Sequence, residues 1–101
     1  MSEIRQGQVY WLDFGRATGS ARLEALPCVV VQNDVFNRSA IATCVVCLIT
    51  SNLSRANAPE VVNVSQILTI DKAELVECTG KLSGMATGAV RDGLHLLFDR
   101  L

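Results

Sequence analysis

A short apolar run between a proline and an Asn-Asp pair constrains the fold of this chain most. Residues 27–34 read Pro-Cys-Val-Val-Val-Gln-Asn-Asp. Valines fit a pleated surface and proline is tolerated at the first position of a strand, so the run predicts a buried strand that begins at Pro27. Asn33 and Asp34 favour a turn that ends it. Gln32 and Asn33 then stand at the rim of the core, where binding sites are often built.

Length and composition indicate one globular domain over residues 1–101. A chain of 101 residues supports a single core, and a hydrophobic content of 50% excludes disorder. No apolar run approaches the roughly 20 residues of a membrane helix, and the first residues lack the apolar stretch of a signal peptide. We therefore expect a cytoplasmic protein without a membrane partner.

The net charge of −1 argues against a protein that binds nucleic acid through bulk positive charge. The four cysteines are Cys28, Cys44, Cys47 and Cys78. Cys44 and Cys47 form a C-x-x-C pair, but residues three apart on a strand point to opposite faces and cannot share one metal ion. We expect free, buried cysteines that act as small apolar residues, and no metal site.

The remaining pattern predicts a mainly β, antiparallel barrel with a C-terminal helix. Strands are expected over residues 8–14, 41–49, 61–70 and 76–82, besides the one that starts at Pro27. A long loop is expected over 15–26, a connection over 34–40 and a bend at 65–66. Asp71 caps a helical turn, and Ser83 caps the C-terminal helix. The apolar stripe of that helix is Ala86, Val90, Leu94, Leu97 and Leu101.

Polar residues at the expected strand ends and in the loop before the central strand are expected to converge into one group. They are Ser20, Arg22, Gln32, Asn33, Thr50, Ser51, Ser65 and Gln66. No phosphate-binding loop, dinucleotide fingerprint or catalytic triad accompanies them, and His95, the single histidine, is expected to be a surface or structural residue. Such a set suits a phosphodiester or base edges, with any catalysis independent of metals and cofactors. Ordinary turn chemistry remains the alternative.

Several motifs resemble those of the MazF/PemK endoribonuclease toxins. The opening Arg5–Asp13 is similar to the family's R-G-x-V-(Y/W) strand, and Gly19-Ser20 to its loop Gly-Ser. PCVVVQNDVFNR, from Pro27, resembles the family's R-P-x-x-V-x-Q-N-D-x-x-N-R. LITS, ending at Ser51, and VNVSQILTIDKAEL, from Val62, resemble its later strand motifs.

The resemblance implies an SH3-like barrel, a homodimer, an antitoxin partner and sequence-selective cleavage of single-stranded RNA that leaves a cyclic phosphate. By motif position it implies a catalytic role for Thr50. It also implies RNA contacts for Ser20, Asn33, Ser51, Ser65 and Gln66.

The chain departs from the family pattern at two places. The family has a catalytic arginine immediately before the strand proline, where this chain has Leu26. A guanidinium stabilises the negative charge of the phosphorane, and leucine cannot. Arg22 is a candidate substitute if the loop folds back. The second departure is a shortening: Pro59-Glu60 runs directly into Val61, without the further strand and extended loop usual in the family.

Two alternatives remain open at this point. A non-catalytic inhibitor of the CcdB type, which binds DNA gyrase on the same fold, needs no catalytic arginine. A barrel that only binds another protein needs neither catalytic residue.

Overall fold

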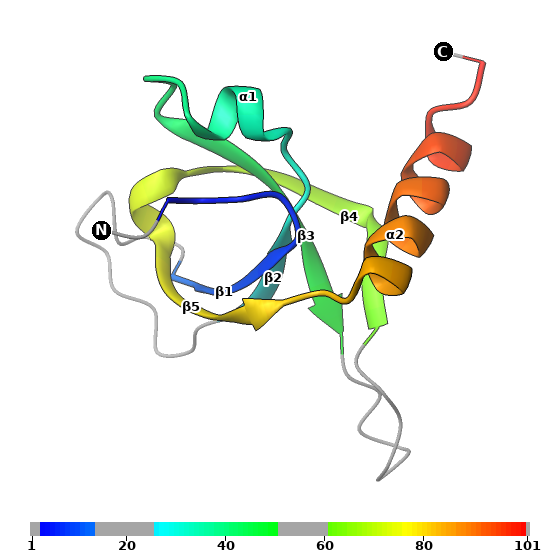
Figure 1. Cartoon of the computed structure of the whole chain (residues 1–101), viewed down its shortest axis with the longest axis horizontal. Coiled ribbons are helices and arrows are strands. Elements are labelled where there is room, and N and C mark those ends of the chain that lie inside the picture. The colour runs from blue at the N-terminus through cyan, green and yellow to red at the C-terminus, as the bar shows by residue number, and fades with distance from the viewer. Residues whose placement is uncertain (1–2, 14–25, 51–60, 101) are drawn as a thin grey trace, which may run out of the picture.

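The computed structural model describes residues 3–13, 26–50 and 61–100. Within them the chain forms five strands, two α-helices and one 3₁₀ helix (Figure 1). The elements are β1 (Gln8–Leu12), β2 (Leu26–Val30), α1 (Asp34–Asn37), β3 (Thr43–Thr50), β4 (Val61–Asp71), η2 (Lys72–Glu74), β5 (Leu75–Lys81) and α2 (Gly84–Leu97).

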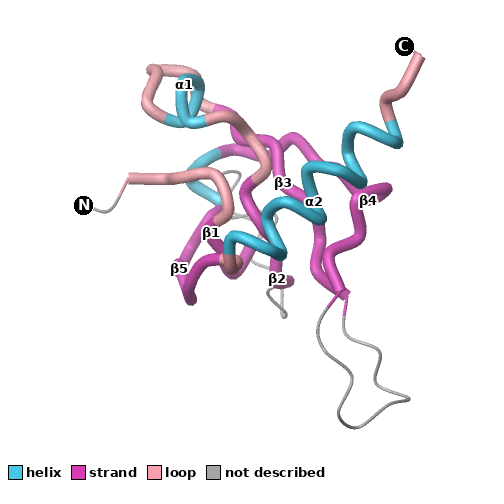
Figure 2. Tube along the Cα trace, turned by 45° about the vertical axis from the view of Figure 1, so that its right-hand side comes forward, coloured by secondary structure: helices cyan, strands magenta, loops and turns pink. Residues whose placement is uncertain are grey.

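The strands form one antiparallel sheet in the order β4-β3-β2-β1-β5. The sheet curls on itself, and α2 lies beside β4 and β3 (Figures 1 and 2). The predicted antiparallel barrel with a C-terminal helix is therefore confirmed. Among the described residues, no helix is long and apolar enough to cross a membrane.

Alternating side chains of the central strands build two apolar clusters on opposite faces of the sheet. We call the cluster that contains Tyr10, Leu12, Cys28 and Val30 the inner cluster. The cluster on the other face, which contains Val29, is called the outer cluster. Leu94 of α2 packs against the outer cluster. This alternation is the period-2 geometry of a strand that is buried on both faces. The run that begins at Pro27 is thus the core strand that the sequence predicts.

Both predicted caps are present. The Asp71 side chain accepts from the Ala73 N–H at 2.8 Å, and Ser83 Oγ accepts from the Ala86 N–H at 3.1 Å. The apolar stripe of α2 is half-buried as far as Leu94, but the Leu97 side chain is 46% exposed, so the expected stripe is wrong at that position. Leu101 lies outside the described residues.

The absence of a side chain at Gly93 lets α2 approach β4. A Cβ built there would lie 3.2 Å from Val64 Cγ1, which is tighter than ordinary van der Waals contact. Glycine lowers the helix propensity of α2, and the close packing against β4 compensates for it.

Several element boundaries differ from the expectations. β1 ends at Leu12, β2 begins one residue before Pro27, and the expected connection over 34–40 contains the short helix α1. Asn33 favours this helix because its side chain accepts from the Val35 N–H at 2.9 Å as the N-cap. The expected bend at residues 65–66 is an irregularity inside β4: residues 63–66 face Leu48 alone, between the pairs Cys47–Ile67 and Ile49–Val62.

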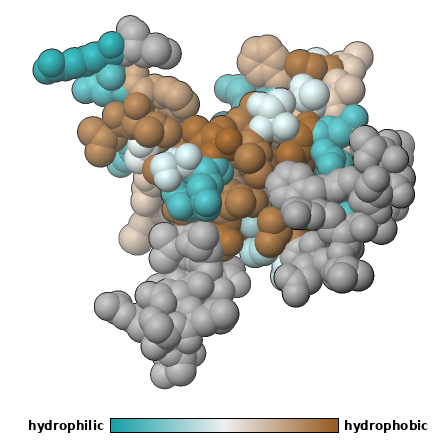
Figure 3. Space-filling view, turned by 180° about the vertical axis from the view of Figure 1, so that it is seen from behind, coloured by the Kyte–Doolittle hydropathy of each residue, from teal (hydrophilic) through white to brown (hydrophobic). Residues whose placement is uncertain are grey.

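Large apolar side chains remain on the surface of the described part. Phe36 and Phe98 are 54% and 53% exposed, and Ile41 is 45% exposed. Seen from behind, apolar side chains gather across the middle of one face (Figure 3). An exposed group of this kind indicates a surface that contacts another molecule.

Candidate active site

The structure brings together two positions that the sequence analysis singled out. β2 starts at Leu26, β3 ends at Thr50, and Cys28 pairs with Leu48 between them. Continuing this antiparallel register by two residues places Leu26 opposite Thr50. Both therefore stand at one end of the sheet, which we call the Leu26–Thr50 end.

Neighbouring strands complete this end. Leu26 pairs with Leu12, and Thr50 pairs with Val61. Asp13 follows Leu12, and its backbone N–H donates to the Glu74 carbonyl at 2.9 Å. Its Oδ1 atom is buried and has no hydrogen-bond partner among the described residues. The Leu26–Thr50 end thus also holds a carboxylate oxygen that can accept a hydrogen bond.

Leu26 belongs to β2, whereas the sequence analysis expected it to be the last residue of the loop over 15–26. It is the first residue of β2 and is half-buried. Alternation along β2 puts it on the same face of the sheet as Cys28. A longer side chain at this position must therefore extend beyond the edge of that face of the sheet to reach a substrate.

Gln32 and Asn33 stand at the opposite end of the sheet, because β2 and β3 run antiparallel. Gln32 serves the fold rather than a binding site. Its Nε2 donates to Asn37 Oδ1 at 2.9 Å and to the Thr43 carbonyl at 3.2 Å, and its Oε1 accepts from the Val45 N–H at 3.2 Å. The expectation that these polar strand ends form one group is therefore wrong.

Asp34 fixes the N-terminal segment to this far end. Its Oδ1 accepts from the Gln6 N–H at 2.6 Å and from Asn37 Nδ2 at 3.0 Å. The Gln6 N–H, followed by the Asn37 amide, lowers the pKa of the Asp34 carboxyl because both donate to its charged form. The carboxylate thereby holds residue 6 beside the end of β2.

The other candidate residues are separated or lie outside the description. Ser65 and Gln66 are exposed in the irregular part of β4, where Ser65 Oγ donates to Asn63 Oδ1 at 2.6 Å. Ser20, Arg22 and Ser51 lie outside the described residues. Their RNA contacts, and the substitute role of Arg22, stay predictions.

The cysteines follow the strand argument except at one position. Cys44 belongs to the inner cluster and Cys47 to the outer cluster, so the two sulfurs lie on opposite faces. Cys28 is buried too, but Cys78 is exposed, so the expected burial is wrong for Cys78. Among the residues described, no three His, Cys, Asp or Glu side chains gather as metal ligands.

Iodoacetamide is expected to modify Cys78 alone in the native protein. Burial raises the pKa of the Cys28 thiol to about 12 and that of Cys44 to about 11, and it also raises the pKa of Cys47. Thiolates, which react, are therefore scarce at these three sites near neutral pH. Mass spectrometry should find one labelled cysteine in the native unmodified protein and none in native Cys78→Ser. All four cysteines should be labelled once the unmodified protein is unfolded. Native labelling of Cys28 as fast as Cys78 would contradict the buried assignment.

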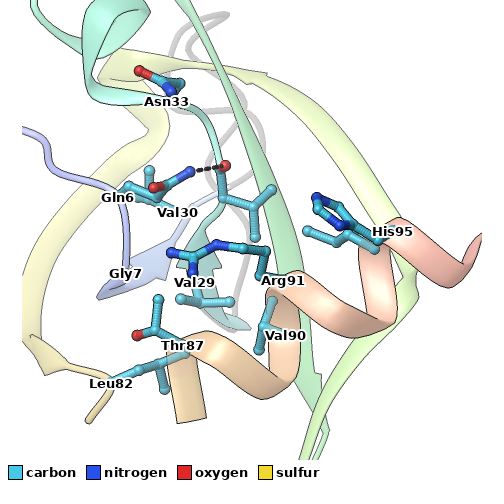
Figure 4. Close-up of a pocket in the computed structure, with 12 residues that line it drawn as sticks. Gln6, Gly7, Val29, Val30, Asn33, Leu82, Thr87, Val90, Arg91 and His95 are labelled. Carbon is cyan, nitrogen blue, oxygen red and sulfur yellow. Dashed lines mark hydrogen bonds between the residues drawn. The ribbon is translucent and has the colours of Figure 1, made fainter. Parts of the chain in front are cut away.

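The sequence analysis missed a groove of about 360 Å³ between α2 and the far end of β2. Arg91 and His95 line it from α2, opposite Gln6 and Asn33 (Figure 4). Residues four apart share one face of a helix, so reading His95 together with Arg91 would have indicated a basic helix face.

Comparison with known proteins identifies the family. A family model described as "PemK-like, MazF-like toxin of type II toxin-antitoxin system" matches residues 5–98. Endoribonuclease MazF6 of Mycobacterium tuberculosis is 31% identical, over 95% of this chain and 97% of that protein. Endoribonuclease EndoA of Bacillus subtilis is 30% identical, over 92% of each. The first alignment covers 111 positions, more than this chain has residues, so the relative has residues without a counterpart here.

Solved structures agree. An endoribonuclease in complex with its cognate antitoxin, from a mycobacterial species, has a TM-score of 0.73 at 25% identity, covering 95% of this chain and 93% of that one. The MazE–MazF structure from Deinococcus radiodurans has a TM-score of 0.74 at 18% identity, covering 98% of both chains, which shows the fold. The chain belongs to the PemK-like, MazF-like toxins of type II toxin–antitoxin systems.

Proposed function

We propose that this chain is an endoribonuclease that cuts single-stranded RNA, with activity reduced by the leucine at position 26. The observation that carries the proposal is the antiparallel register that sets Leu26 opposite Thr50. These are the positions that correspond to the family's catalytic arginine and threonine. The relatives named above are endoribonucleases, which supports the same reaction class.

The chemistry follows from these two positions. The 2′-hydroxyl loses its proton and attacks the adjacent phosphorus, the bond to the 5′-oxygen breaks, and the 5′-oxygen takes up a proton and leaves as a 5′-hydroxyl, so that a cyclic phosphate remains. We assign Thr50 to a hydrogen bond with the scissile phosphate. The missing guanidinium would stabilise the charge that develops on the phosphorane oxygens. Leu26 lacks any donor, so this chain performs the reaction without that stabilisation unless Arg22 supplies it.

The biological setting is proposed on the same basis. An antitoxin protein is the expected partner, because one similar solved structure is a complex with its cognate antitoxin. We also propose a homodimer, a cytoplasmic location and a single domain over residues 1–101. The gyrase-binding alternative is not favoured, since the family model and the named relatives are MazF/PemK toxins.

Incubation with a labelled single-stranded RNA tests the activity directly. A discrete set of fragments ending in a cyclic phosphate supports the proposal. If neither this chain nor its Leu26→Arg variant cuts any RNA in a mixed-sequence pool, the enzymatic proposal fails.

Cleavage is expected to be unaffected by EDTA. The sequence has no cluster of carboxylate or Cys/His residues with ligand spacing, and a 2′-hydroxyl attack needs hydrogen-bond donors and a proton acceptor near the phosphate, which side chains can supply without a metal ion. The measurement compares initial cleavage rates in chelator and in magnesium. Activity that disappears in EDTA and returns with magnesium would show that the donor set has been misread.

A further inference from the structure

The groove beside α2 carries positive charge that nothing in the described structure neutralises. Arg91 and His95 are exposed, and neither forms a hydrogen bond or ion pair with a described residue. The Arg91 guanidinium extends across the groove toward Gln6 (Figure 4). No aspartate or glutamate is among the residues that line the groove. A groove with this lining attracts anions.

The floor of the groove is apolar, and amide groups border it. The floor is formed by Val29, Val31, Leu82, Val90 and Leu94. At the rim, Asn33 uses its Oδ1 to cap α1, and its Nδ2 has no partner among the described residues. The Gln6 Nε2 is held by the Val31 carbonyl at 2.8 Å. An apolar floor with the unpaired Asn33 amide donor at its rim fits a flat, polar-edged group such as a nucleobase.

A second groove of about 480 Å³ continues from the first, since Val31, Asn33 and Leu94 line both. It is bordered by Phe36 from α1 and Phe98 from the end of α2, and both rings are more than half exposed. These are two of the five aromatic residues in the chain. The continuous groove therefore combines the Arg91 guanidinium with exposed aromatic faces.

We propose that this groove along α2 binds single-stranded RNA outside the cleavage site. Grooves that bind single strands combine positive charge for the backbone with aromatic rings on which bases stack, and both are present here. Arg91 and His95 would contact phosphates, and Phe36 and Phe98 would stack with bases. An acidic peptide would also satisfy Arg91, but the two flat rings favour bases.

The position of the groove indicates which part of the RNA it holds. Asn33, Val31 and Val45 stand at the end of the sheet opposite Leu26 and Thr50. The groove would therefore hold nucleotides several positions away from the scissile phosphate. This inference rests on the proposed function in that RNA is the ligand, but it needs no catalysis.

Binding measurements on variants of the folded protein test the proposal. The probe is a fluorescein-labelled pool of mixed-sequence, twelve-nucleotide RNA with 2′-O-methyl groups, which cannot be cut. Arg91→Gln should lower the slope of log affinity against log salt by about 0.7, the value for one lost phosphate contact to a single strand. Phe36→Ala and Phe98→Ala should each weaken binding about fivefold or more.

Two control variants remove a positive charge and a large apolar side chain outside the groove. Lys81→Gln removes an exposed charge outside the groove, and Leu96→Ala truncates a side chain of α2 that is 77% exposed. Neither should change affinity by more than about twofold. Thermal unfolding checks that each variant is folded.

Three results would overturn the proposal. The first is that the unmodified chain does not bind the RNA probe, and the second is that the groove variants bind it as tightly as the controls do. The third is that Arg91→Gln weakens the binding of an oligo-glutamate peptide but not the binding of RNA. Cleavage of unmethylated RNA is assayed separately. Groove-dependent binding without cleavage would reject the proposed function alone, and cleavage without groove-dependent binding would reject this inference alone.

Discussion

Leu26→Arg is expected to raise RNA cleavage by about 10²–10³-fold, the usual value of one donor to a transition-state oxyanion. The arginine side chain would extend from a position opposite Thr50, at the end of the sheet where β2 begins and β3 ends. A guanidinium carries a fixed charge and several donors, which suits the phosphorane oxygens. Initial rates on a labelled single-stranded RNA measure the gain, and Leu26→Met, which adds length without charge, is the matched control.

Two further variants separate this explanation from a substitute role for Arg22. In the Leu26→Arg background, Thr50→Ala should lower cleavage again, and the two effects should not simply add because both groups act on one phosphate. If Arg22 already supplies the charge, the unmodified chain cuts RNA well, Arg22→Ala abolishes cleavage and Leu26→Arg adds little. Equal rates for Leu26→Arg and Leu26→Met would reject the proposed role of position 26.

Because Leu26 is half-buried within β2, the arginine variant also tests the local fold. A charge at this position loses some hydration unless it reaches solvent or a partner, so a modest loss of stability is expected. Thermal unfolding distinguishes this loss from a change in catalysis.

Local signals predicted much of the fold. Apolar runs gave the strands, and the hydrogen-bonding side chains of Asp71 and Ser83 gave the starts of η2 and α2. These features depend on residues close together in the sequence. The short helix α1 was missed because Asn33 and Asp34 were read as a simple turn, although an asparagine followed by an aspartate also fits an N-cap and first helical turn.

The candidate site was predicted less well, because strand ends were treated as one place. Successive antiparallel strands end at alternate edges, so Thr50 and Asn33 are separated by the length of β2. Motif position singled out Leu26 and Thr50, and the register of β2 and β3, continued by two residues, sets these positions opposite each other. Their roles in catalysis stay predictions. The basic face of α2 was missed because His95 was considered without Arg91.

The buried side chain of Asn37 is expected to be the largest polar contribution to stability in the described part of the chain. It is 7% exposed. Its Nδ2 donates to the Gln32 carbonyl at 2.8 Å and to Asp34 Oδ1 at 3.0 Å, while its Oδ1 accepts from Gln32 Nε2 at 2.9 Å. Asn37→Ala removes all three bonds and takes this donor from the Gln32 carbonyl, while Gln32 Nε2 keeps its bond to the Thr43 carbonyl and Asp34 Oδ1 keeps its bond from the Gln6 N–H. The free energy of unfolding should therefore fall by about 2–4 kcal/mol.

Urea unfolding with two control variants measures this effect. Asn33→Ala removes one N-cap bond at an exposed asparagine and should cost about 1 kcal/mol, whereas the exposed Arg38→Ala should cost less than about 0.5 kcal/mol. The lowered pKa of Asp34 adds a pH test. A carboxyl with a lowered folded-state pKa stabilises the protein above its unfolded pKa and loses this contribution as the pH falls through the folded value. The loss of unfolding free energy caused by Asn37→Ala should therefore be smaller in acid, because protonation of Asp34 weakens the Asn37–Asp34 hydrogen bond in the unmodified chain as well. A cost for Asn37→Ala no larger than that for Arg38→Ala would mean that the Asn37 amide does not join α1 to the end of β2.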